Sequence, residues 1–199
     1  MGAAFGLLAP AVDWQHLRMS ILETERLLFR QHQESDRESY CEMESDPEYR
    51  WPQVVHPRAE LERSFREGWL PPKSLGLLAT VFKPEGRYIG RCGLYPLRNE
   101  ANEVVPGEAV IAFYLARPYW GRGLATEAGR AFIEYGFGPL GLSRIEAGMN
   151  VKNLASIRVI EKLGFAWVRS GEGGGSSWHL YQLRKAAGVQ GAQEPRRSQ

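Results

Sequence analysis

The stretch Arg117-Pro-Tyr-Trp-Gly-Arg-Gly-Leu-Ala-Thr126 decides how the rest of the chain is interpreted. It follows an apolar run at residues 108–115 that is typical of a strand, and it precedes a run to about residue 137 with the apolar periodicity of a helix. The glycines leave backbone N–H groups unblocked at the start of this helix, where unpaired donors and the helix dipole both attract anions. The stretch therefore predicts either a phosphate-binding turn or an ordinary tight turn between a strand and a helix.

A second strand and a second helix follow this stretch. Residues 144–150 are typical of a strand, and Asn153 is placed to cap a helix that Gly164 ends. A strand at 108–115, a helix at 123–137 and a strand at 144–150 together form one strand–helix–strand unit. Such a unit predicts two parallel strands joined by a right-handed crossover.

The remaining segments predict shorter, mostly antiparallel elements. We expect strands at 25–30, 75–83, 88–95, 165–170 and 177–184, helices at 36–45 and 59–69, a polar loop at 97–107 and a flexible loop at 171–177. The predicted fold class is α/β (α+β), with a mixed central sheet of about seven strands and about four helices. We place one domain at residues 21–185, between an N-terminal extension, residues 1–20, and a polar C-terminal tail, residues 186–199.

Length and composition restrict the class of protein. The chain has 199 residues, enough for one domain, and its 43% hydrophobic and 24% charged residues exclude a wholly disordered protein. The net charge of +2 argues against a protein that binds nucleic acid over a broad basic face. Residues 117–169, however, carry eight basic and four acidic residues, a net charge of +4 that suits a compact anion such as a nucleotide diphosphate.

Cysteines, histidines and apolar runs restrict the cellular context. Cys41 and Cys92 are too few for a disulfide framework and predict buried, reduced thiols. The four histidines lack metal-ligand spacing, so we expect no metal. No apolar run approaches the ~20 residues that span a bilayer, and the N-terminus lacks the positive start of a signal peptide. We predict a cytoplasmic protein without a membrane partner, with Met19 as a possible alternative start.

Two motifs resemble the GCN5-related N-acetyltransferases, the GNAT superfamily, and especially its branch of ribosomal-protein N-terminal acetyltransferases, RimJ and RimL. The acetyl-CoA signature Gln/Arg-x-x-Gly-x-Gly/Ala is similar to Trp120-Gly-Arg-Gly-Leu-Ala125. A second signature is similar to Asn153, Ser156, Gly164 and Phe165, and the opening strand of the branch is similar to Glu23-Thr-Glu-Arg-Leu-Leu28. The resemblance spans about residues 23–184 and implies a GNAT fold with splayed parallel central strands, acetyl-CoA as co-substrate and an amine as acceptor.

The resemblance also implies where acetyl-CoA binds. The pyrophosphate is expected on the backbone N–H groups of the turn and the first helical residues, which are Gly121, Arg122, Gly123, Leu124, Ala125 and Thr126. The pantetheine arm is expected to pair, like an added strand, with Phe113, Tyr114 and Leu115. Asn153 is expected to hold the pantetheine amide, and Ser156 is expected near the sulfur. An ordinary helix N-cap and a small helical residue are the alternatives for these two.

The implied reaction is direct attack of a neutral amine on the thioester in a ternary complex. Many relatives use a Tyr seven residues after the Asn as general acid, and Ile160 stands there, so we expect Ser156 to donate a hydrogen bond to the thiolate. Relatives often carry a Glu at the position of Val110. Glu108 lies on the same strand face and is expected to act as the base through a water, a solvated strand-end carboxylate being the alternative.

A weak base favours an amine that loses its proton easily. An α-amine, with a pKa of about 7.7–8.0, is roughly one tenth neutral at pH 7, whereas a lysine, at about 10.4, is neutral about once in 2,500. We therefore expect a peptide N-terminus or a small-molecule amine as acceptor, and a monomer or homodimer that does not bind nucleic acid. The alternative is a non-catalytic acyl-CoA-binding or regulatory domain.

Five aromatic residues lie in segments that often face the acceptor in the family. These are Trp51, His56, Trp69, Trp178 and His179. Packing or surface exposure is the alternative for each of them.

Overall fold

The structure, a computed structural model, describes residues 22–49, 56–70, 76–173 and 175–186. The described strands are β1 (Leu22–Glu23), β2 (Leu27–Arg30), β3 (Gly76–Phe82), β4 (Arg87–Arg98), β5 (Val104–Leu115), β6 (Arg144–Asn150), β7 (Ala166–Gly173) and β8 (Ser176–Arg184). The α-helices are α1 (Arg37–Glu44), α2 (Arg58–Gly68), α3 (Leu124–Phe137) and α4 (Leu154–Lys162), with short 3-10 turns η1 (Glu34–Asp36) and η2 (Arg117–Tyr119).

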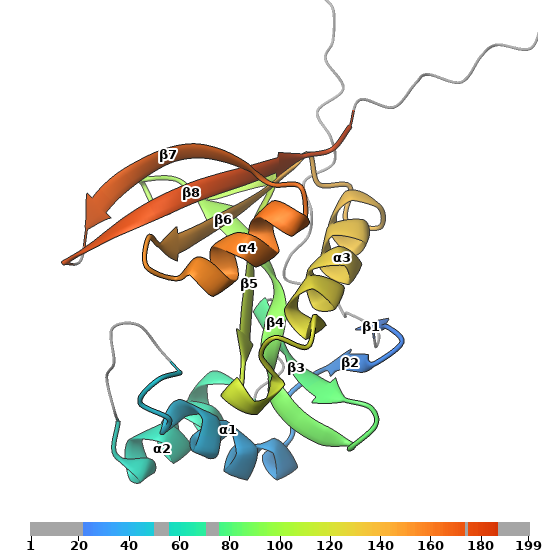
Figure 1. Cartoon of the computed structure of the whole chain (residues 1–199), viewed down its shortest axis with the longest axis vertical. Helices are drawn as coiled ribbons and strands as arrows, with labels where there is room; N and C mark the ends of the chain where they lie inside the picture. Colours follow the sequence, from blue (N-terminus) through green and yellow to red (C-terminus); the bar gives the residue numbers. More distant parts are fainter. Residues whose placement is uncertain (1–21, 50–55, 71–75, 174, 187–199) are drawn as a thin grey trace, which may run out of the picture.

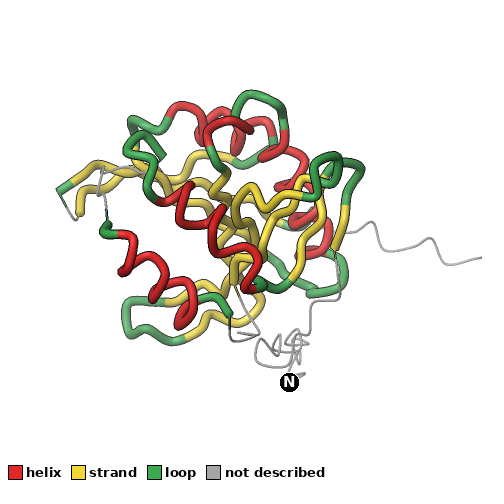
Figure 2. The backbone as a smooth tube through the Cα atoms, turned by 90° about the horizontal axis from the view of Figure 1, so that it is seen from below, coloured by secondary structure: helices red, strands yellow, loops and turns green. Residues whose placement is uncertain are grey.

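The strands form one mixed sheet in the order β1-β2-β3-β4-β5-β6-β8-β7 (Figure 1). Only β5 and β6 pair in parallel among the described strands, and α3 makes the crossover between them. Figure 2 shows helices flanking the strands on both sides. The predicted mixed α/β sheet is confirmed.

The two parallel strands separate soon after they meet. Their register joins Glu108 to Arg144, Ala109 to Ile145 and Val110 to Glu146, and it ends there. Beyond that point β5 continues to Leu115 along β4, and β6 continues along β8. Figure 1 shows β5 running toward α1 and α2 while β6 turns toward the tip of the β7–β8 hairpin. The predicted splayed central strands are therefore present.

Side chains alternate between two cores on opposite faces of the sheet. The larger core places Ala109, Ile111 and Ile145 against Phe132 of α3 and Ile160 of α4. The smaller core lies beneath α1 and α2 and includes residues of β3 and β4. Two helices thus cover the N-terminal part of one face, while the other two cover the opposite face at the parallel strands.

The structure corrects three details of the prediction. The two-residue strand β1, which pairs with β2, makes the sheet eight-stranded. The loop predicted at 97–107 is shorter, because β4 reaches Arg98 and β5 begins at Val104. Hydrogen bonds between Asn99 and Glu103 close that turn. The loop predicted at 171–177 is also mostly strand, because β7 reaches Gly173 and β8 begins at Ser176.

Both cysteines are free and buried, as predicted. Burial raises the pKa of the Cys92 thiol to about 12, so this thiol stays protonated at neutral pH. The predicted extension at 1–20 and nearly all of the tail at 186–199 lie outside the described residues.

Candidate active site

The glycine turn leads directly from η2 into α3. Gly121 and Gly123 have φ of 72° and 78°, a left-handed conformation that favours glycine because it has no Cβ. Gly123 is the N-cap of α3, and no side chain of the described residues caps this end. The N–H groups of the first helical turn, from Leu124 to Thr126, therefore point out of the helix without intrahelical acceptors. This arrangement presents donors and the positive end of a helix dipole to an anion.

An arginine from the turn between β1 and β2 holds the glycine turn in place, and the sequence prediction missed it. Arg26 Nη1 donates to the carbonyl of Arg122 at 3.0 Å, and Arg26 Nε donates to Glu127 of α3 at 2.7 Å. Glu127 also accepts from the Thr24 hydroxyl at 2.6 Å and from the Arg26 N–H at 3.0 Å. Burial raises the pKa of Glu127, but these hydrogen bonds outweigh it and leave that pKa lowered. The carboxylate thus stays charged and fixes the first turn of α3 to the turn between β1 and β2.

The side chain of Arg122 lies against aromatic rings. Its guanidinium carbon is 4.6 Å from the centre of the Phe82 ring and 5.3 Å from that of Tyr119. Stacking fixes the direction of the cation without using its N–H donors. Arg122 is exposed, so these donors remain accessible beside the glycine turn.

The edge of β5 that faces β6 offers backbone groups to a ligand. Ala116 N–H donates to Ile89 of β4 at 2.8 Å. In an antiparallel pair, neighbouring residues direct their backbone groups to opposite sides, so those of Phe113 and Leu115 point away from β4 and those of Tyr114 point toward it. The carbonyl of Leu115 already accepts from the indole of Trp120 at 2.5 Å. Phe113 is therefore the residue of this trio best placed to pair with an extended ligand.

The start of α4 follows the end of β6. Asn153 Oδ1 accepts from the Ser156 N–H at 3.1 Å, which makes Asn153 the N-cap of α4. The amide nitrogen of Asn153 is not used in this contact and stays available as a donor. Ser156 is half-buried in the first turn of α4, and buried Ile160 stands one turn further on. Asn153 is thus a helix N-cap, which was the alternative to a binding role. The N-cap contact uses only its side-chain oxygen, so the expected binding role through the amide nitrogen stays a prediction.

The predicted base, Glu108, lies in a polar group where β5 and β6 are still paired. Arg144 Nη2 contacts Glu108 Oε2 and also Glu146 Oε1, the latter at 3.4 Å. Gln182 of β8 donates to Glu146 Oε1 at 2.8 Å. The group therefore holds two carboxylates around one guanidinium, and the sequence prediction considered only the first.

A buried arginine lies beneath the same face of β5. Arg91 pairs with Glu44 at 2.5 Å, and both side chains are 2% exposed. The rings of Trp69 and Tyr114 lie 4.9 Å from its guanidinium carbon, and the ring of Tyr40 lies 5.4 Å away. Trp69, one of the aromatic residues predicted to line the acceptor side or to pack, thus packs against Arg91.

The other aromatic residues considered for the acceptor side are spread over the molecule. The ring of His56 contacts Glu60 at 3.0 Å, that of Trp178 stacks on Arg169, and that of His179 contacts Ser170 at 2.8 Å. Trp51 lies outside the described residues.

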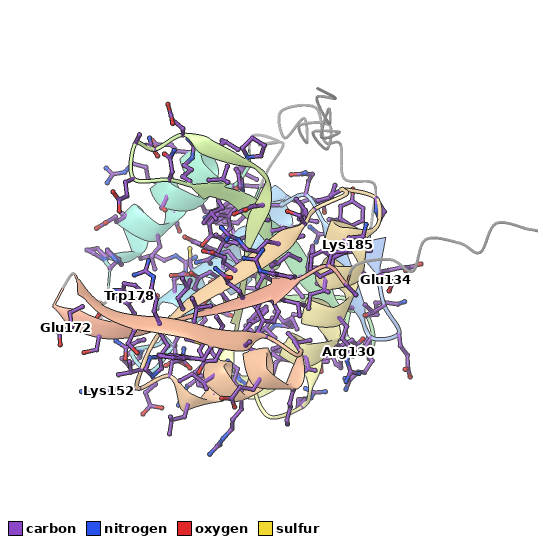
Figure 3. All side chains as sticks on the ribbon, turned by 90° about the horizontal axis from the view of Figure 1, so that it is seen from above. Arg130, Glu134, Lys152, Glu172, Trp178 and Lys185 are labelled. Carbon is purple, nitrogen blue, oxygen red and sulfur yellow. The ribbon has the colours of Figure 1, made fainter. Side chains whose placement is uncertain are left out.

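A pocket of about 410 Å³ opens next to the α4 N-terminus. It lies between the β6–α4 connection and the tip of the β7–β8 hairpin, and it includes Asn150, Lys152, Glu172 and Ser177. Figure 3 shows Lys152, Glu172 and Trp178 at this end of the molecule, far from Arg130 and Glu134 of α3.

Two features are absent from the described part of the chain. No three His, Cys, Asp or Glu side chains within them come together as metal ligands. No helix in the described part of the chain is long and apolar enough to span a membrane.

Comparisons with known proteins agree on one family. Residues 26–166 match the family model described as an acetyltransferase (GNAT) domain. An uncharacterized N-acetyltransferase, p20 of Bacillus licheniformis, is 32% identical over 153 residues, which cover 74% of this chain and 83% of that protein. The probable N-acetyltransferase YjcK of Bacillus subtilis is 40% identical over 81 residues, which cover 41% of this chain and 42% of that protein.

Solved structures share the fold. A GNAT-family acetyltransferase from Bacillus anthracis has a TM-score of 0.70 and 22% identity, covering 83% of this chain and 98% of that one. RimL, a ribosomal L7/L12 alpha-N-protein acetyltransferase solved in complex with coenzyme A, has a TM-score of 0.62 and 16% identity, covering 83% of this chain and 98% of that one.

Proposed function

The chain belongs to the GNAT acetyltransferase family, and from this premise we propose that it transfers an acetyl group from acetyl-CoA to a primary amine. One observation carries the proposal. The parallel strands β5 and β6 part after Val110 and Glu146, and each leads at its carboxyl end into a helix N-terminus. Ligands of α/β sheets bind at the carboxyl ends of diverging strands, where helix N-termini favour anionic groups. A long, thin molecule with a pyrophosphate fits such a site.

We assign the pyrophosphate to the turn from Gly121 to Thr126, with Arg122 beside it. The pantetheine arm would run along Phe113, Tyr114 and Leu115 as an added strand. The free amide nitrogen of Asn153 would donate to a pantetheine carbonyl, and Ser156 would lie near the sulfur. The uncapped α3 N-terminus and the outward backbone of Phe113 support this placement.

The chemistry follows from these positions. The neutral amine attacks the thioester carbon, the C–S bond breaks, and the nitrogen loses a proton as the amide forms. A thiol has a pKa of about 8.5, so the thiolate departs without a strong acid. Ser156 is proposed to stabilise it by a hydrogen bond. The proton acceptor we propose is a carboxylate near the point where the parallel strands β5 and β6 diverge, and Glu108 is the residue that the sequence predicts for this role.

The acceptor we propose is an α-amine or another amine of low pKa, as in the RimJ and RimL branch. The solved structures of similar fold include a ribosomal-protein-S5-alanine acetyltransferase from Vibrio fischeri. At 19% identity that likeness shows the fold alone. The support for an α-amine is therefore chemical, because an α-amine is neutral at pH 7 far more often than a lysine and depends less on a base.

The proposal is tested by acetyl-CoA binding and by thiol release. Calorimetry should show binding, and free thiol should appear with at least one amine from a panel of N-terminal peptides, amino acids, polyamines and aminoglycosides. Absence of binding would refute the proposal, and binding without turnover across the panel would instead indicate a non-catalytic domain. Faster acetylation of lysine side chains than of α-amines would refute the proposed acceptor class.

Two glycines make a matched pair for the binding test. Gly121 and Gly141 have φ of 72° and 63°, and a Cβ at either would meet no atom within 4 Å. Gly121→Ala and Gly141→Ala should therefore lower the free energy of unfolding alike, by about 1 kcal/mol. Only Gly121→Ala should weaken acetyl-CoA binding, by about tenfold, because its Cβ blocks close approach to the backbone.

A further inference from the structure

Glu146 stands at the last residue pair before β5 and β6 diverge. Its register partner is Val110, the position where the sequence lacks the expected glutamate. A carboxylate from the neighbouring strand thus stands beside the position where β5 has none.

The side chain of Glu146 points to the face of the sheet opposite α3 and α4. Its neighbours Ile145 and Ala147 belong to the core beneath these helices, and side chains alternate along a strand. Val110 and Tyr114 lie on the same face as Glu146, by the same alternation along β5. The carboxylate therefore lies on the side of the sheet away from the expected pyrophosphate, the side from which we expect the second substrate to approach.

The two oxygens of Glu146 differ. Oε1 accepts from Gln182 at 2.8 Å and lies 3.4 Å from Arg144 Nη2. Oε2 makes no hydrogen bond to the described residues. The residue is 8% exposed, so its orientation is fixed by packing and by the contacts of one oxygen. One fixed and one open oxygen is an arrangement that can take up a proton in a defined direction.

Glu108 is less well placed for the same task. The opening is the point after Val110 and Glu146 where β5 and β6 diverge. Glu108 lies two residues before Val110, which is about 7 Å further from this opening, given the rise per residue of a strand. Its Oε2 is already engaged by Arg144. Among the described residues the charged group in contact with Glu146 is Arg144 on its own strand, and Arg144 also contacts Glu108 on β5. The residue of β8 in register with Glu146 is the uncharged Gln182, and Arg184 of β8 is in register with Arg144. Arg144 thus connects the two carboxylates. Of the two, Glu146 is the one nearer the opening.

We propose that Glu146, rather than Glu108, accepts the proton from the acceptor amine, directly or through one water, and that Gln182 and the Glu108–Arg144 pair position it. The inference rests on the proposed function. The ammonium gives one proton to the Glu146 carboxylate, and the neutral nitrogen then forms the C–N bond as the C–S bond breaks. The attacking nitrogen loses its second proton to solvent, which leaves the neutral amide. The thiolate leaves with the electron pair and takes a proton from solvent, and Glu146 returns its proton to solvent.

The test compares Glu146→Gln with Glu108→Gln in the full chain, using acetyl-CoA and the best amine of the panel. Glu146→Gln should lower kcat about 100-fold at pH 7 and leave the acetyl-CoA Kd unchanged, within the range of general-base effects. Glu108→Gln, which only loosens a positioning contact, should lower kcat less than about fivefold. Glu134→Gln on α3, at the far end of the molecule in Figure 3, is the unchanged control.

A pH profile separates chemistry from structure. The rate of Glu146→Gln should keep rising about tenfold per pH unit toward the pKa of the amine, while the wild-type rate levels off earlier. Formate should restore part of the lost rate in Glu146→Gln but not in Glu108→Gln. Wild-type turnover with full activity in Glu146→Gln would overturn this inference alone. A wild type that releases no thiol would overturn the proposed function, and the role of Glu146 with it.

Discussion

Two arginine–glutamate ion pairs differ in how deeply they are buried, and this difference decides what each contributes to the molecule. Arg91 and Glu44 are each 2% exposed and are enclosed by Tyr40, Trp69 and Tyr114. Arg26 and Glu127 are 39% and 18% exposed, and they join the turn between β1 and β2 to the start of α3. The first pair is part of a core, and the second fixes the position of a surface loop. The comparison teaches that the same chemistry stabilises the fold in one place and shapes the proposed binding site in the other.

The largest effect on stability is expected at the buried pair. Arg91→Met should lower the free energy of unfolding by about 3–5 kcal/mol, because it removes the guanidinium that pairs with the buried Glu44 carboxylate. The double variant Arg91→Met/Glu44→Leu should recover much of this loss, since replacing both partners avoids the buried charge. Urea denaturation measures both. Equal stability of the single and double variants would show that the pair behaves like a surface contact.

The next largest effect is a pH dependence of the free energy of unfolding, which we expect from buried His32 near Arg91. Burial lowers the pKa of His32 to about 4, and the ring nitrogen Nε2 lacks a hydrogen-bond partner among the described residues. The unfolded chain binds this proton below about pH 6.5 and the folded chain only below about pH 4, so stability should fall as the pH drops through this window, by about 3 kcal/mol. Denaturation of His32→Leu at the same pH values should show a flatter dependence. A slope equal to that of the wild type would contradict the assignment to His32.

The exposed pair should affect binding more than stability. Arg26→Ala should raise the acetyl-CoA Kd about fivefold and lower the free energy of unfolding by about 1 kcal/mol or less, because charge-assisted hydrogen bonds to the turn are lost. Lys83→Ala is the matched control, since its Nζ donates to the Thr24 carbonyl at 2.9 Å without reaching α3. Calorimetry with acetyl-CoA measures the Kd of both variants. Equal Kd values for both variants would show that the turn holds its shape without Arg26.

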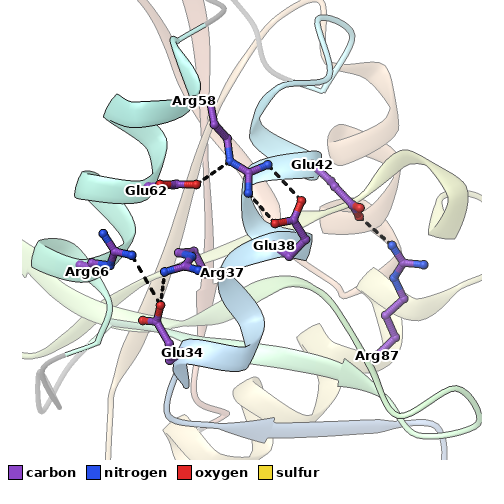
Figure 4. Close-up of polar contacts among 8 residues, drawn as sticks. All are labelled: Glu34, Arg37, Glu38, Glu42, Arg58, Glu62, Arg66 and Arg87. Carbon is purple, nitrogen blue, oxygen red and sulfur yellow. Dashed lines mark hydrogen bonds and ion pairs between the residues drawn. The ribbon is translucent and has the colours of Figure 1, made fainter.

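The smallest effect is expected where both partners are exposed. Arg58 joins Glu38 of α1 to Glu62 of α2 within a row of surface ion pairs (Figure 4). Arg58→Ala should lower Tm only slightly at low salt and not at all at about 1 M salt, because solvent screens such pairs. Thermal unfolding at two salt concentrations checks this. A salt-independent loss would mean that Arg58 contributes through packing.

The sequence predicted the fold where local signals are strong. Gly121, Gly123 and Asn153 mark two helix starts, and the structure places α3 and α4 there. The hairpin turns were predicted too long, because Arg98 and Gly173 extend strands whose pairing depends on the partner strand rather than on their own type.

The parts of the site that the sequence missed depend on distant contacts. Arg26 lies 101 positions from Glu127, and Gln182 lies 36 positions from Glu146. No periodicity or spacing in one sequence connects such pairs. Glu146 carried one available signal, a charged residue between apolar ones in a predicted strand, and that signal marks many surface positions as well.

The early end of the β5–β6 pairing has a thermodynamic consequence. Three residue pairs join the two halves of the sheet, and β5 beyond Val110 has no neighbour on that side among the described strands. A ligand lying along this edge would act as a missing strand and would connect the halves. The stability of the chain should then follow ligand concentration, rising by about 2.7 kcal/mol at a hundred times Kd. In a cell, the abundance of the folded protein would thus depend on the supply of its own co-substrate.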